Sequence, residues 1–328
     1  MRINKGDYVP DGFPAFSAKG QDGFVAVWEY DRPAVVLSAI GARCGKCFLA
    51  TGRWTSLANT HLIFPDVTVA NPKFLWYQLN DESSWIRSGS AQPFIKPSDI
   101  KTRKVKLPPL SEQERIVGIL DEAEGLRQRR AEADRRTADL LPALFHHMFG
   151  DPATNPKGWP LKSFDETFLD ETSKSPKLLQ GNYANSGRFP VVDQGQDFVA
   201  GYSDDESMLC KSVLPVLIFG DHTRVVKLVT EPFIVGADGA KVLIPRSDFL
   251  AAYAAELLRN MPIRDLGYSR HMKEVKRQVF MCPPLSLQRE FAERVGEVRE
   301  LERRQAESRR RLDALFAALL DRAFNGSL

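Results

Sequence analysis

The stretch PPLSEQERIVGILDEAEGLRQRRAEADRRTADLLPALFHHMFGDP, residues 108–152, determines the fold of this chain. Its opening Pro-Pro-Leu-Ser-x-Gln returns at residues 283–288, about 175 residues later, and a second long charged segment follows it. Self-similarity at a fixed spacing is the signature of a repeated structural unit. Each copy is therefore predicted to contain a globular part followed by a long helix.

Apolar residues in both charged segments recur at spacings of three and four, which is typical of a coiled-coil seam. Neither helix can bury its stripe alone, so we predict that the two pair antiparallel, each about 50 Å long at 1.5 Å per residue. Arg130 and Gln305 interrupt the two stripes, and Ser111 is expected to cap the first helix. The predicted seam consists of Ile116, Ile119, Ala123, Leu126, Leu140 and Leu144 in the first helix and of Val298, Leu301, Leu312, Leu315 and Leu319 in the second.

The globular parts are predicted to be mixed α+β domains. Short β-type runs, such as residues 34–37 and 213–218, are separated by clusters of Gly, Asn and Asp. One helix is expected late in each part, at residues 72–80 and 247–259, the second capped by Ser247-Asp248. The predicted fold class is α+β: two domains with curved mixed β-sheets, separated by two long helices that form an antiparallel coiled coil. The predicted boundaries are 1–107 for the first domain, 108–150 for the first helix, 151–282 for the second domain and 283–328 for the second helix.

Composition sets broader bounds on the protein. With 328 residues, 43% of them hydrophobic, the chain can bury about two cores. Its net charge of +3 permits a nucleic-acid partner without requiring one. The 4 cysteines do not suggest a disulfide framework, and no signal peptide or long apolar run is present. We expect a soluble, cytoplasmic protein with no membrane partner.

Five segments of the first copy stand out: LPPLSEQERIV (107–117), ILD (119–121), LRQRR (126–130), FGDP (149–152) and NPKGW (155–159). Together they resemble the specificity subunits of type I restriction–modification systems. The weaker second copy, at residues 283–324, is similar to the second helical repeat of that family, so the resemblance covers almost the whole chain.

The resemblance implies two target-recognition domains, each reading half of a bipartite DNA site, with the helices as a ruler between them. It further implies docking of two methyltransferase subunits and association of restriction–translocase subunits. S-adenosylmethionine and ATP are then expected on those partners, and no cofactor in this chain. The opening of the second domain, from Trp159 to Gly181, has no counterpart before Gly6. The first domain is therefore expected to lack its N-terminal segment.

Candidate DNA contacts recur at matched places in the two copies. A basic cluster precedes each Pro-Pro-Leu, and the loops before these clusters, residues 89–92 and 267–271, carry side chains able to reach bases. A second pair of loops, residues 43–46 and 222–224, follows a glycine that ends a predicted strand. The predicted DNA-binding residues are Arg43, Lys46, Ser90, Gln92, Lys96, Lys101, Arg103, Lys104, Thr223, Arg224, Ser269, Arg270, His271 and Lys273.

A basic cluster also fits a plain solvated surface, and for any one cluster the sequence leaves this alternative open. Recurrence at the same place in both copies favours phosphate binding, which supplies much of the affinity for DNA. Because Gln pairs with adenine and Arg with guanine, the predicted base readers are Gln92, Arg43, Arg224 and Arg270.

No catalytic or metal site is predicted. Cys44 and Cys47 have the spacing of a zinc knuckle, but a structural zinc site needs four ligands and no second pair is present. Asn71-Pro72-Lys73-Phe74 superficially resembles the Asn-Pro-Pro-aromatic motif of amino-methyltransferases, yet proline in a first helical turn explains it. No nucleotide-binding glycine loop occurs. The sequence predicts a non-catalytic recognition subunit.

Two rival interpretations remain open at this stage. In the first, the globular parts carry methyltransferase or nuclease chemistry, and the chain would bind a methyl donor. In the second, the chain is a degenerate or truncated specificity subunit that acts as a protein-binding coiled-coil scaffold without productive DNA readout. The missing opening segment of the first domain favours the second rival.

Overall fold

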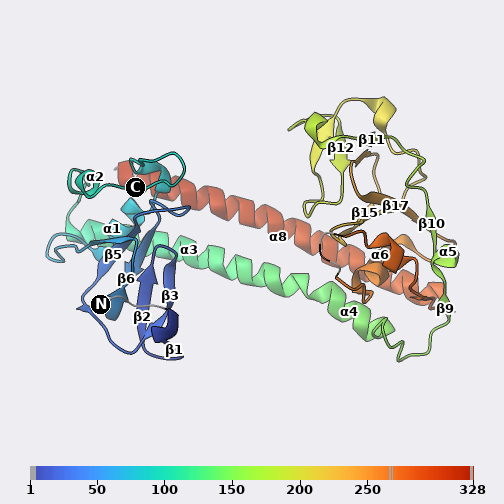
Figure 1. The fold of residues 1–328 in the computed structure, drawn as a ribbon, viewed down its shortest axis with the longest axis horizontal. Coiled ribbons are helices and arrows are strands. Elements are labelled where there is room, and N and C mark those ends of the chain that lie inside the picture. The colour runs from blue at the N-terminus through green and yellow to red at the C-terminus, as the bar shows by residue number, and fades with distance from the viewer. Residues whose placement is uncertain (1–4, 266, 268, 326–327) are drawn as a thin grey trace. The chain divides into compact units, whose positions relative to one another are not determined.

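A computed structural model of the chain describes residues 5–265, 267, 269–325 and 328 (Figure 1). The chain divides into two compact units: unit 1 comprises Met1–Ala131 and Glu307–Leu328, and unit 2 comprises Glu132–Ala306. The α-helices are α1 (Pro72–Leu79), α2 (Pro97–Lys101), α3 (Leu110–Ala138), α4 (Leu140–Phe149), α5 (Phe164–Thr167), α6 (Ala251–Asn260), α7 (Met272–Val275) and α8 (Leu285–Asn325). Short 3-10 helices are η1 (Lys5–Asp7), η2 (Glu82–Ser84), η3 (Gln180–Asn182) and η4 (Glu206–Met208).

Unit 1 contains two curved sheets beside α1. The larger has the order β1-β3-β2-β7-β4, with β2 and β7 parallel and the other neighbours antiparallel. The smaller is antiparallel, in the order β6-β5-β8, and every residue of its central strand β5 is buried. The strands are β1 (Tyr8–Val9), β2 (Phe13–Ser17), β3 (Gly20–Val25), β4 (Tyr30–Asp31), β5 (Ala34–Ser38), β6 (Cys47–Ala50), β7 (Arg53–Ser56) and β8 (Thr60–Ile63).

Unit 2 is built on the same plan. Its sheets have the orders β10-β17-β14-β15 and β11-β16-β12-β13, and a short pair joins β18 to β9. Strand β16 is parallel to β11 and to β12, whereas β14 pairs antiparallel with both of its neighbours. The strands are β9 (Leu161–Lys162), β10 (Phe168–Asp170), β11 (Lys177–Leu178), β12 (Phe189–Val192), β13 (Gly201–Ser203), β14 (Val216–Gly220), β15 (Val226–Val229), β16 (Ile234–Gly236), β17 (Ala240–Pro245) and β18 (Phe280–Met281).

The two units share a topology, as the sequence repeat predicts. The order β6-β5-β8 in unit 1 corresponds to β15-β14-β17 in unit 2, and β3-β2-β7 corresponds to β13-β12-β16. Each of the latter sets contains one antiparallel and one parallel pairing in the same places. Unit 2 additionally has β9 and β10, which lie in the opening segment of its domain. That segment is the part for which the sequence finds no counterpart in the first copy.

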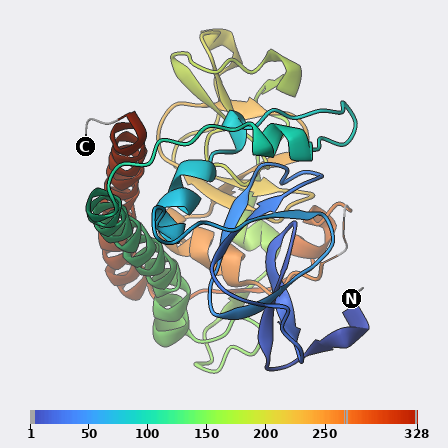
Figure 2. The ribbon, with the colours of Figure 1, turned by 90° about the vertical axis from the view of Figure 1, so that its left-hand side faces the viewer.

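The long helices pair antiparallel within each unit. In unit 1 the Arg127 Nε donates to Asp313 Oδ1 at 2.8 Å, and Ile116, earlier in α3, packs in one cluster with Ala323, later in α8. Figure 2 shows these parts of α3 and α8 side by side. In unit 2 the Phe145 ring of α4 lies 5.9 Å from the Phe291 ring of α8. The predicted fold class, α+β with an antiparallel pair of long helices, is confirmed.

The register of the predicted seam is wrong at the leucines Leu126, Leu140, Leu301 and Leu315, which are 39–47% exposed. Ile116 and Ala123 are buried, while Ile119, Leu144, Val298, Leu312 and Leu319 are half-buried. Leu120, Leu141 and Phe145 are among the residues that fill the buried positions. The physical reason is that each long helix packs against its partner and also against α1 or α6, so its buried face is set by two neighbours. The first helix also breaks at Asp139, close to Pro142, which cannot donate a helical hydrogen bond.

The repeated Pro-Pro-Leu-Ser-x-Gln motif fastens the long helix to the domain helix in unit 1. The side chain of Gln113 is fully buried, and its Oε1 accepts the backbone N–H of Asn71 at 2.8 Å. Its Nε2 donates to the carbonyls of Val69 and Pro108, both at 2.8 Å. Asn71 in turn caps α1 through its own side chain, with Pro72 in the first turn as expected. The predicted cap at Ser111 is wrong, because α3 begins one residue earlier.

Unit 2 repeats this arrangement with the second copy of the motif. The buried Gln288 accepts the backbone N–H of Leu250 at 2.8 Å, and its Nε2 donates to the carbonyls of Asp248 and Pro283 at 2.9 Å. The predicted cap at Ser247-Asp248 is wrong, since α6 begins at Ala251 after Leu250. We call this three-bond arrangement, around Gln113 in unit 1 and Gln288 in unit 2, the glutamine clamp.

Candidate nucleic-acid interface

Two loops of unit 1 meet beyond the end of β5. Gly41, with φ of +94°, turns the chain after this strand, and its backbone N–H donates to the carbonyl of Pro93 at 2.9 Å. Ser88 and Phe94 pair antiparallel across the second loop, with both backbone hydrogen bonds at 2.9 Å. The structure therefore brings together the loops 43–46 and 89–92, which are far apart in the sequence.

Most candidate side chains of unit 1 reach solvent around these loops. Arg43, Ser90, Gln92, Lys96, Lys101 and Lys104 are exposed, and Lys46 is half-buried. Arg103 differs, because its guanidinium donates to the carbonyl and to the hydroxyl of Ser84 at 2.7 and 2.8 Å and lies 4.2 Å from the ring centroid of Trp85. Through these contacts, Arg103 fixes the backbone around η2.

The matching loops of unit 2 also meet. Arg224, with φ of +61°, donates to the carbonyl of Ile263 at 3.1 Å and forms an ion pair with Asp265 at 2.7 Å. The backbone N–H of His271 donates to the carbonyl of Asp221 at 2.7 Å. The loop after β14 is therefore tied to both ends of the segment 263–271. Leu266 and Tyr268 of this segment lie outside the described residues.

The candidate side chains of unit 2 divide into two groups. Ser269, Arg270 and Lys273 are exposed. Thr223 donates to the carbonyl of Gln194 at 2.6 Å and so helps to fix the loop, as Arg224 does.

The prediction that His271 contacts DNA is wrong. Its side chain is fully buried, and its Nδ1 lies 2.9 Å from the Asp221 carbonyl oxygen. Asp221 itself is buried and accepts the backbone N–H of Met272 at 2.7 Å through Oδ1, while Lys241 Nζ lies 3.4 Å from its other carboxylate oxygen. His271 and Asp221 therefore form the buried joint between the two loops.

Sequence reasoning also missed Lys227, which holds the segment 193–197 beside the loop after β14, where the Thr223 hydroxyl donates to the carbonyl of Gln194. Lys227 is 3% exposed, and its Nζ donates to the carbonyls of Asp193 at 2.8 Å and Asp197 at 2.5 Å. Burial lowers the pKa of Lys227, and the neighbouring carboxylates of Asp193 and Asp197 act in the opposite direction. The available signal was a lone lysine within the otherwise apolar strand β15.

The two cysteines with zinc-knuckle spacing point into the core of unit 1. Cys44 and Cys47 are both buried, and the Cys47 Sγ donates to the carbonyl of Leu79 at 3.3 Å. Burial raises the pKa of Cys47 to about 12, so its thiol stays protonated. Within the described residues, no group of three or more His, Cys, Asp or Glu side chains is placed to hold a metal ion.

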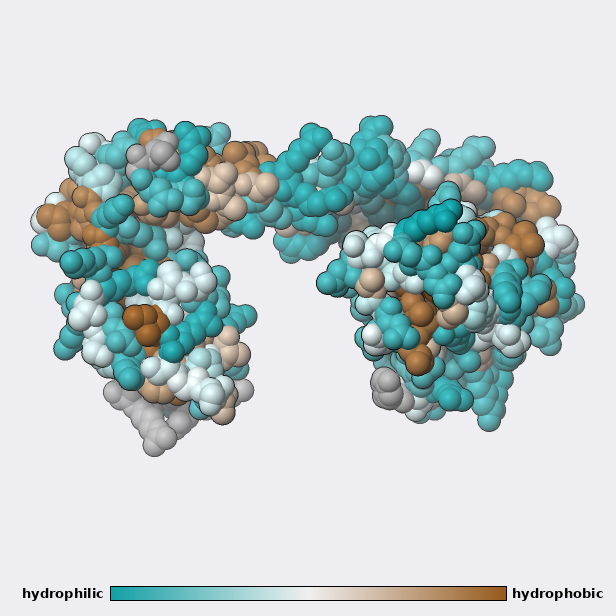
Figure 3. Space-filling view, turned by 90° about the horizontal axis from the view of Figure 1, so that it is seen from above, coloured by the Kyte–Doolittle hydropathy of each residue, from teal (hydrophilic) through white to brown (hydrophobic). Residues whose placement is uncertain are grey.

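The outer faces of the long helices are strongly charged. Hydrophilic residues cover most of the visible face of these helices in Figure 3. Hydrogen bonds from Arg303 and Arg304 hold the pKa of the Glu300 carboxyl at about 2.

In the part of the chain that the structure describes, no helix combines the length and apolar character needed to cross a membrane.

Comparisons with known proteins agree with this geometry. Residues 18–132 match the family model described as the type I restriction modification DNA specificity domain. A stretch of 100 residues, 30% of this chain, is 26% identical to a putative type I specificity subunit of Mycoplasma pneumoniae. The chain spans 30% of the length of that curated relative.

Two solved structures share the fold over nearly the whole chain. The crystal structure of a type I restriction–modification S subunit from M. genitalium is 16% identical, with a TM-score of 0.63 over 99% of this chain and 92% of that one. A structure from work on complex assembly and conformational transition of the type I restriction–modification system is 17% identical. Its TM-score is 0.59, over 99% of this chain and 93% of that one. Residues 18–132 thus resemble the type I specificity domain in sequence, and the chain shares its fold with these S subunits over 99% of its length.

Proposed function

We propose that this chain is a non-catalytic subunit that recognises a DNA sequence for a type I restriction–modification complex. The observation that carries the proposal is the repeated pair of loops, 41–46 with 88–95 in unit 1 and 221–224 with 263–271 in unit 2. In each unit, exposed basic and polar side chains surround a joint made by backbone hydrogen bonds, with Gln92 as the amide in unit 1 and Ser269 as the hydroxyl in unit 2. Such loops suit phosphate contacts for affinity and base contacts for specificity.

A bipartite site follows from the duplication. Two domains of one topology but different loops can each read a different half-site, and the bases between the half-sites remain unread. The charged outer faces of α3 and α8 suit recruitment of two methyltransferase subunits and, through the complex, of the restriction subunits. In this proposal, S-adenosylmethionine and ATP are bound by those partners.

The first test measures binding to random duplex DNA as a function of salt, with and without the methyltransferase subunit. Each phosphate contact contributes about 0.9 to the slope of log K against log salt. Replacing Lys101 and Lys104 by Ala should reduce the slope by nearly 2 if both side chains contact phosphate. The double Lys→Arg variant keeps both charges and should keep the slope. A slope that is unchanged by the alanine variant refutes the assignment of these lysines.

The second test separates base reading from phosphate binding. Methylome sequencing of the host with and without the gene gives the recognition sequence. Gln92→Ala should relax the preference within one half-site and leave the salt slope unchanged. If the chain with its methyltransferase partner binds no duplex and supports no site-specific methylation, the proposal fails and the scaffold interpretation replaces it.

A further inference from the structure

In unit 2, a short extended segment closes the junction between the domain and the long helices. Strand β9 pairs with β18 so that Leu161 lies opposite Met281, and the backbone N–H of Cys282 donates to the carbonyl of Pro160 at 2.8 Å. The indole N–H of Trp159 donates to the carbonyl of Phe149 at 2.9 Å, at the end of α4. Residues 159–161, with the sequence Trp-Pro-Leu, thereby bridge the end of one long helix and the strand before the other.

The same segment also caps the end of α4. The Nζ of Lys157 donates to the carbonyls of His147 and Met148, both at 2.8 Å, and the ring of Pro156 lies directly over Gly150. A lysine at a helix carboxyl end satisfies free carbonyls and complements the helix dipole. The segment 156–161 is therefore an integral cover of this junction in unit 2.

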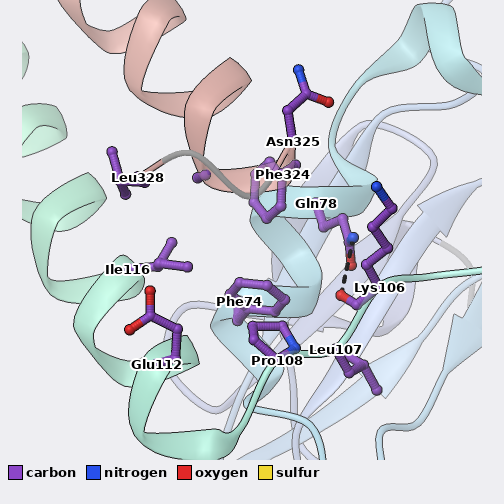
Figure 4. A pocket seen from close by; sticks show the side chains of 11 residues that line it. Phe74, Gln78, Lys106, Leu107, Pro108, Glu112, Ile116, Phe324, Asn325 and Leu328 are labelled. Atoms are coloured by element: carbon purple, nitrogen blue, oxygen red, sulfur yellow. Dashed lines mark hydrogen bonds between the residues drawn. The ribbon is translucent and has the colours of Figure 1, made fainter.

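In unit 1, the counterparts of the covered residues line an open pocket. At the spacing of the repeat, Met281 and Cys282 correspond to Lys106 and Leu107, and Phe149 corresponds to Phe324. The pocket has a volume of about 350 Å³ and lies between α1, the start of α3 and the end of α8 (Figure 4). Its walls include Phe74, Leu107, Pro108, Ile116, Phe324 and Leu328.

The backbone at the mouth of this pocket has unused donors. Residues 105–107 correspond to β18 and the residue after it, yet they form no strand in unit 1. Within the described part of the chain, the backbone N–H groups of Val105, Lys106 and Leu107 have no hydrogen-bond partner. The side chains of Val105 and Leu107 are 37% and 41% exposed. An exposed row of free donors beside apolar side chains is a template for strand addition.

We propose that this pocket and the edge at residues 105–107 bind an extended segment of a separate polypeptide with an aromatic-Pro-aliphatic sequence. The sequence of the occupant follows from the repeat: in unit 2 the same place is taken by Trp159-Pro160-Leu161. The Trp159-Pro160-Leu161 segment of this chain is already engaged in unit 2, and the proposed occupant of unit 1 is a segment of the same chemistry on a partner protein. Its aromatic ring enters between Phe74 and Phe324, and its next residues pair with the edge.

The experiment uses the full chain and a fluorescein-labelled peptide, GDPATNPKGWPLKSFDE, which corresponds to residues 150–166. Fluorescence anisotropy should show saturable binding with one peptide per chain. Hydrogen exchange should show new protection of the amides of Val105 and Leu107, which face the added strand, and not of the Lys106 amide between them, which faces away. Trp159→Ala in the peptide should weaken binding at least tenfold, since it removes the ring that fills the pocket.

Leu107→Asp in the chain should also weaken binding at least tenfold, and its exposed position makes folding of this variant secure. Leu315→Asp is the matched control, because Leu315 is 47% exposed on α8 outside the pocket, and it should bind as the wild type does. Absence of saturable binding, or equal binding by Leu107→Asp, overturns the proposal. A dimer of the chain that Leu107→Asp dissociates also overturns it, since a second copy would then be the occupant. None of these outcomes depends on DNA binding.

Discussion

Replacement of Gln113 by Leu tests whether the glutamine clamp couples the long helix to the domain. Leucine has nearly the same volume, so packing changes little, but it can neither accept from Asn71 nor donate to Val69 and Pro108. Burying a backbone donor or acceptor without a partner costs about 1–3 kcal/mol. The substitution therefore tests the loss of the three hydrogen bonds without creating a cavity.

The structure sets the size of the effect. Val69 is 54% exposed, so its carbonyl can bond to water once the amide is removed. Asn71 and Pro108 are half-buried, and their two groups are left without a partner. At about 1–2 kcal/mol each, the expected loss is about 2–4 kcal/mol. Gln113→Glu keeps the acceptor for Asn71 but places a buried carboxylate oxygen against the carbonyls of Val69 and Pro108, so at neutral pH it should destabilise at least as much as Gln113→Leu.

Hydrogen exchange followed by mass spectrometry is the suitable assay, because two units need not unfold in one transition. At 1.4 kcal/mol for each factor of ten, amides of α1 should exchange about 30- to 1000-fold faster in Gln113→Leu. Gln288→Leu should produce the same change in α6 of unit 2. Gln128→Leu, on the exposed face of α3, is the matched control. Equal exchange of α1 in Gln113→Leu and Gln128→Leu would refute the clamp.

Two further predictions concern buried groups. Because burial raises the pKa of Cys47 from 9.0 to about 12, the unfolded chain loses this proton first, and stability should fall as pH rises from about 9 towards 12. Urea unfolding of Cys47→Ala should show a weaker decline, and peptide mapping at pH 8 should find Cys210 alkylated well before Cys47. Gln305 donates to Thr137 at 2.9 Å, so Gln305→Leu should cost about 1–2 kcal/mol. Adding Thr137→Val should restore most of that stability, and a double mutant no better than Gln305→Leu would contradict the pairing.

The sequence predicts the architecture well because its signals are periodic and repeated. A spacing of three and four in two long segments is enough to predict two paired helices, and the matched order of strands follows from the repeat. Which leucines are buried was not predictable, because each long helix packs against α1 or α6 as well as against its partner helix, and both contacts determine its buried face. Leu120, which lies outside the predicted stripe, is fully buried, whereas Leu126, six residues later and on that stripe, is exposed.

The repeat predicted matched loops in the two units, and the structure brings the two loops of each unit together. The contacts of their individual side chains were not predictable. His271, Arg224 and Arg103 have residue types suited to DNA contact, but each makes hydrogen bonds within its own unit. A sequence does not show whether a donor faces solvent or a neighbouring carbonyl. Lys227 illustrates the converse, since a lysine in a strand suggests exposure yet serves here as a buried support.

These internal contacts have a consequence for recognition. A side chain that is held by its own backbone neighbours loses little conformational entropy on binding, but it also has fewer donors left for a base. Arg224 and Thr223 therefore suit the role of fixing the loop of unit 2, while Arg270, exposed at the end of the facing segment, is free to change partner. By the same reasoning, the proposed function favours Gln92 as a reader of unit 1, because Arg103 is occupied by Ser84 and Trp85 and Arg43 donates to the carbonyl of Lys19 at 2.7 Å. The duplicated framework can stay the same while such exposed positions differ between the units, and under the proposed function this division would let two similar domains read two different half-sites.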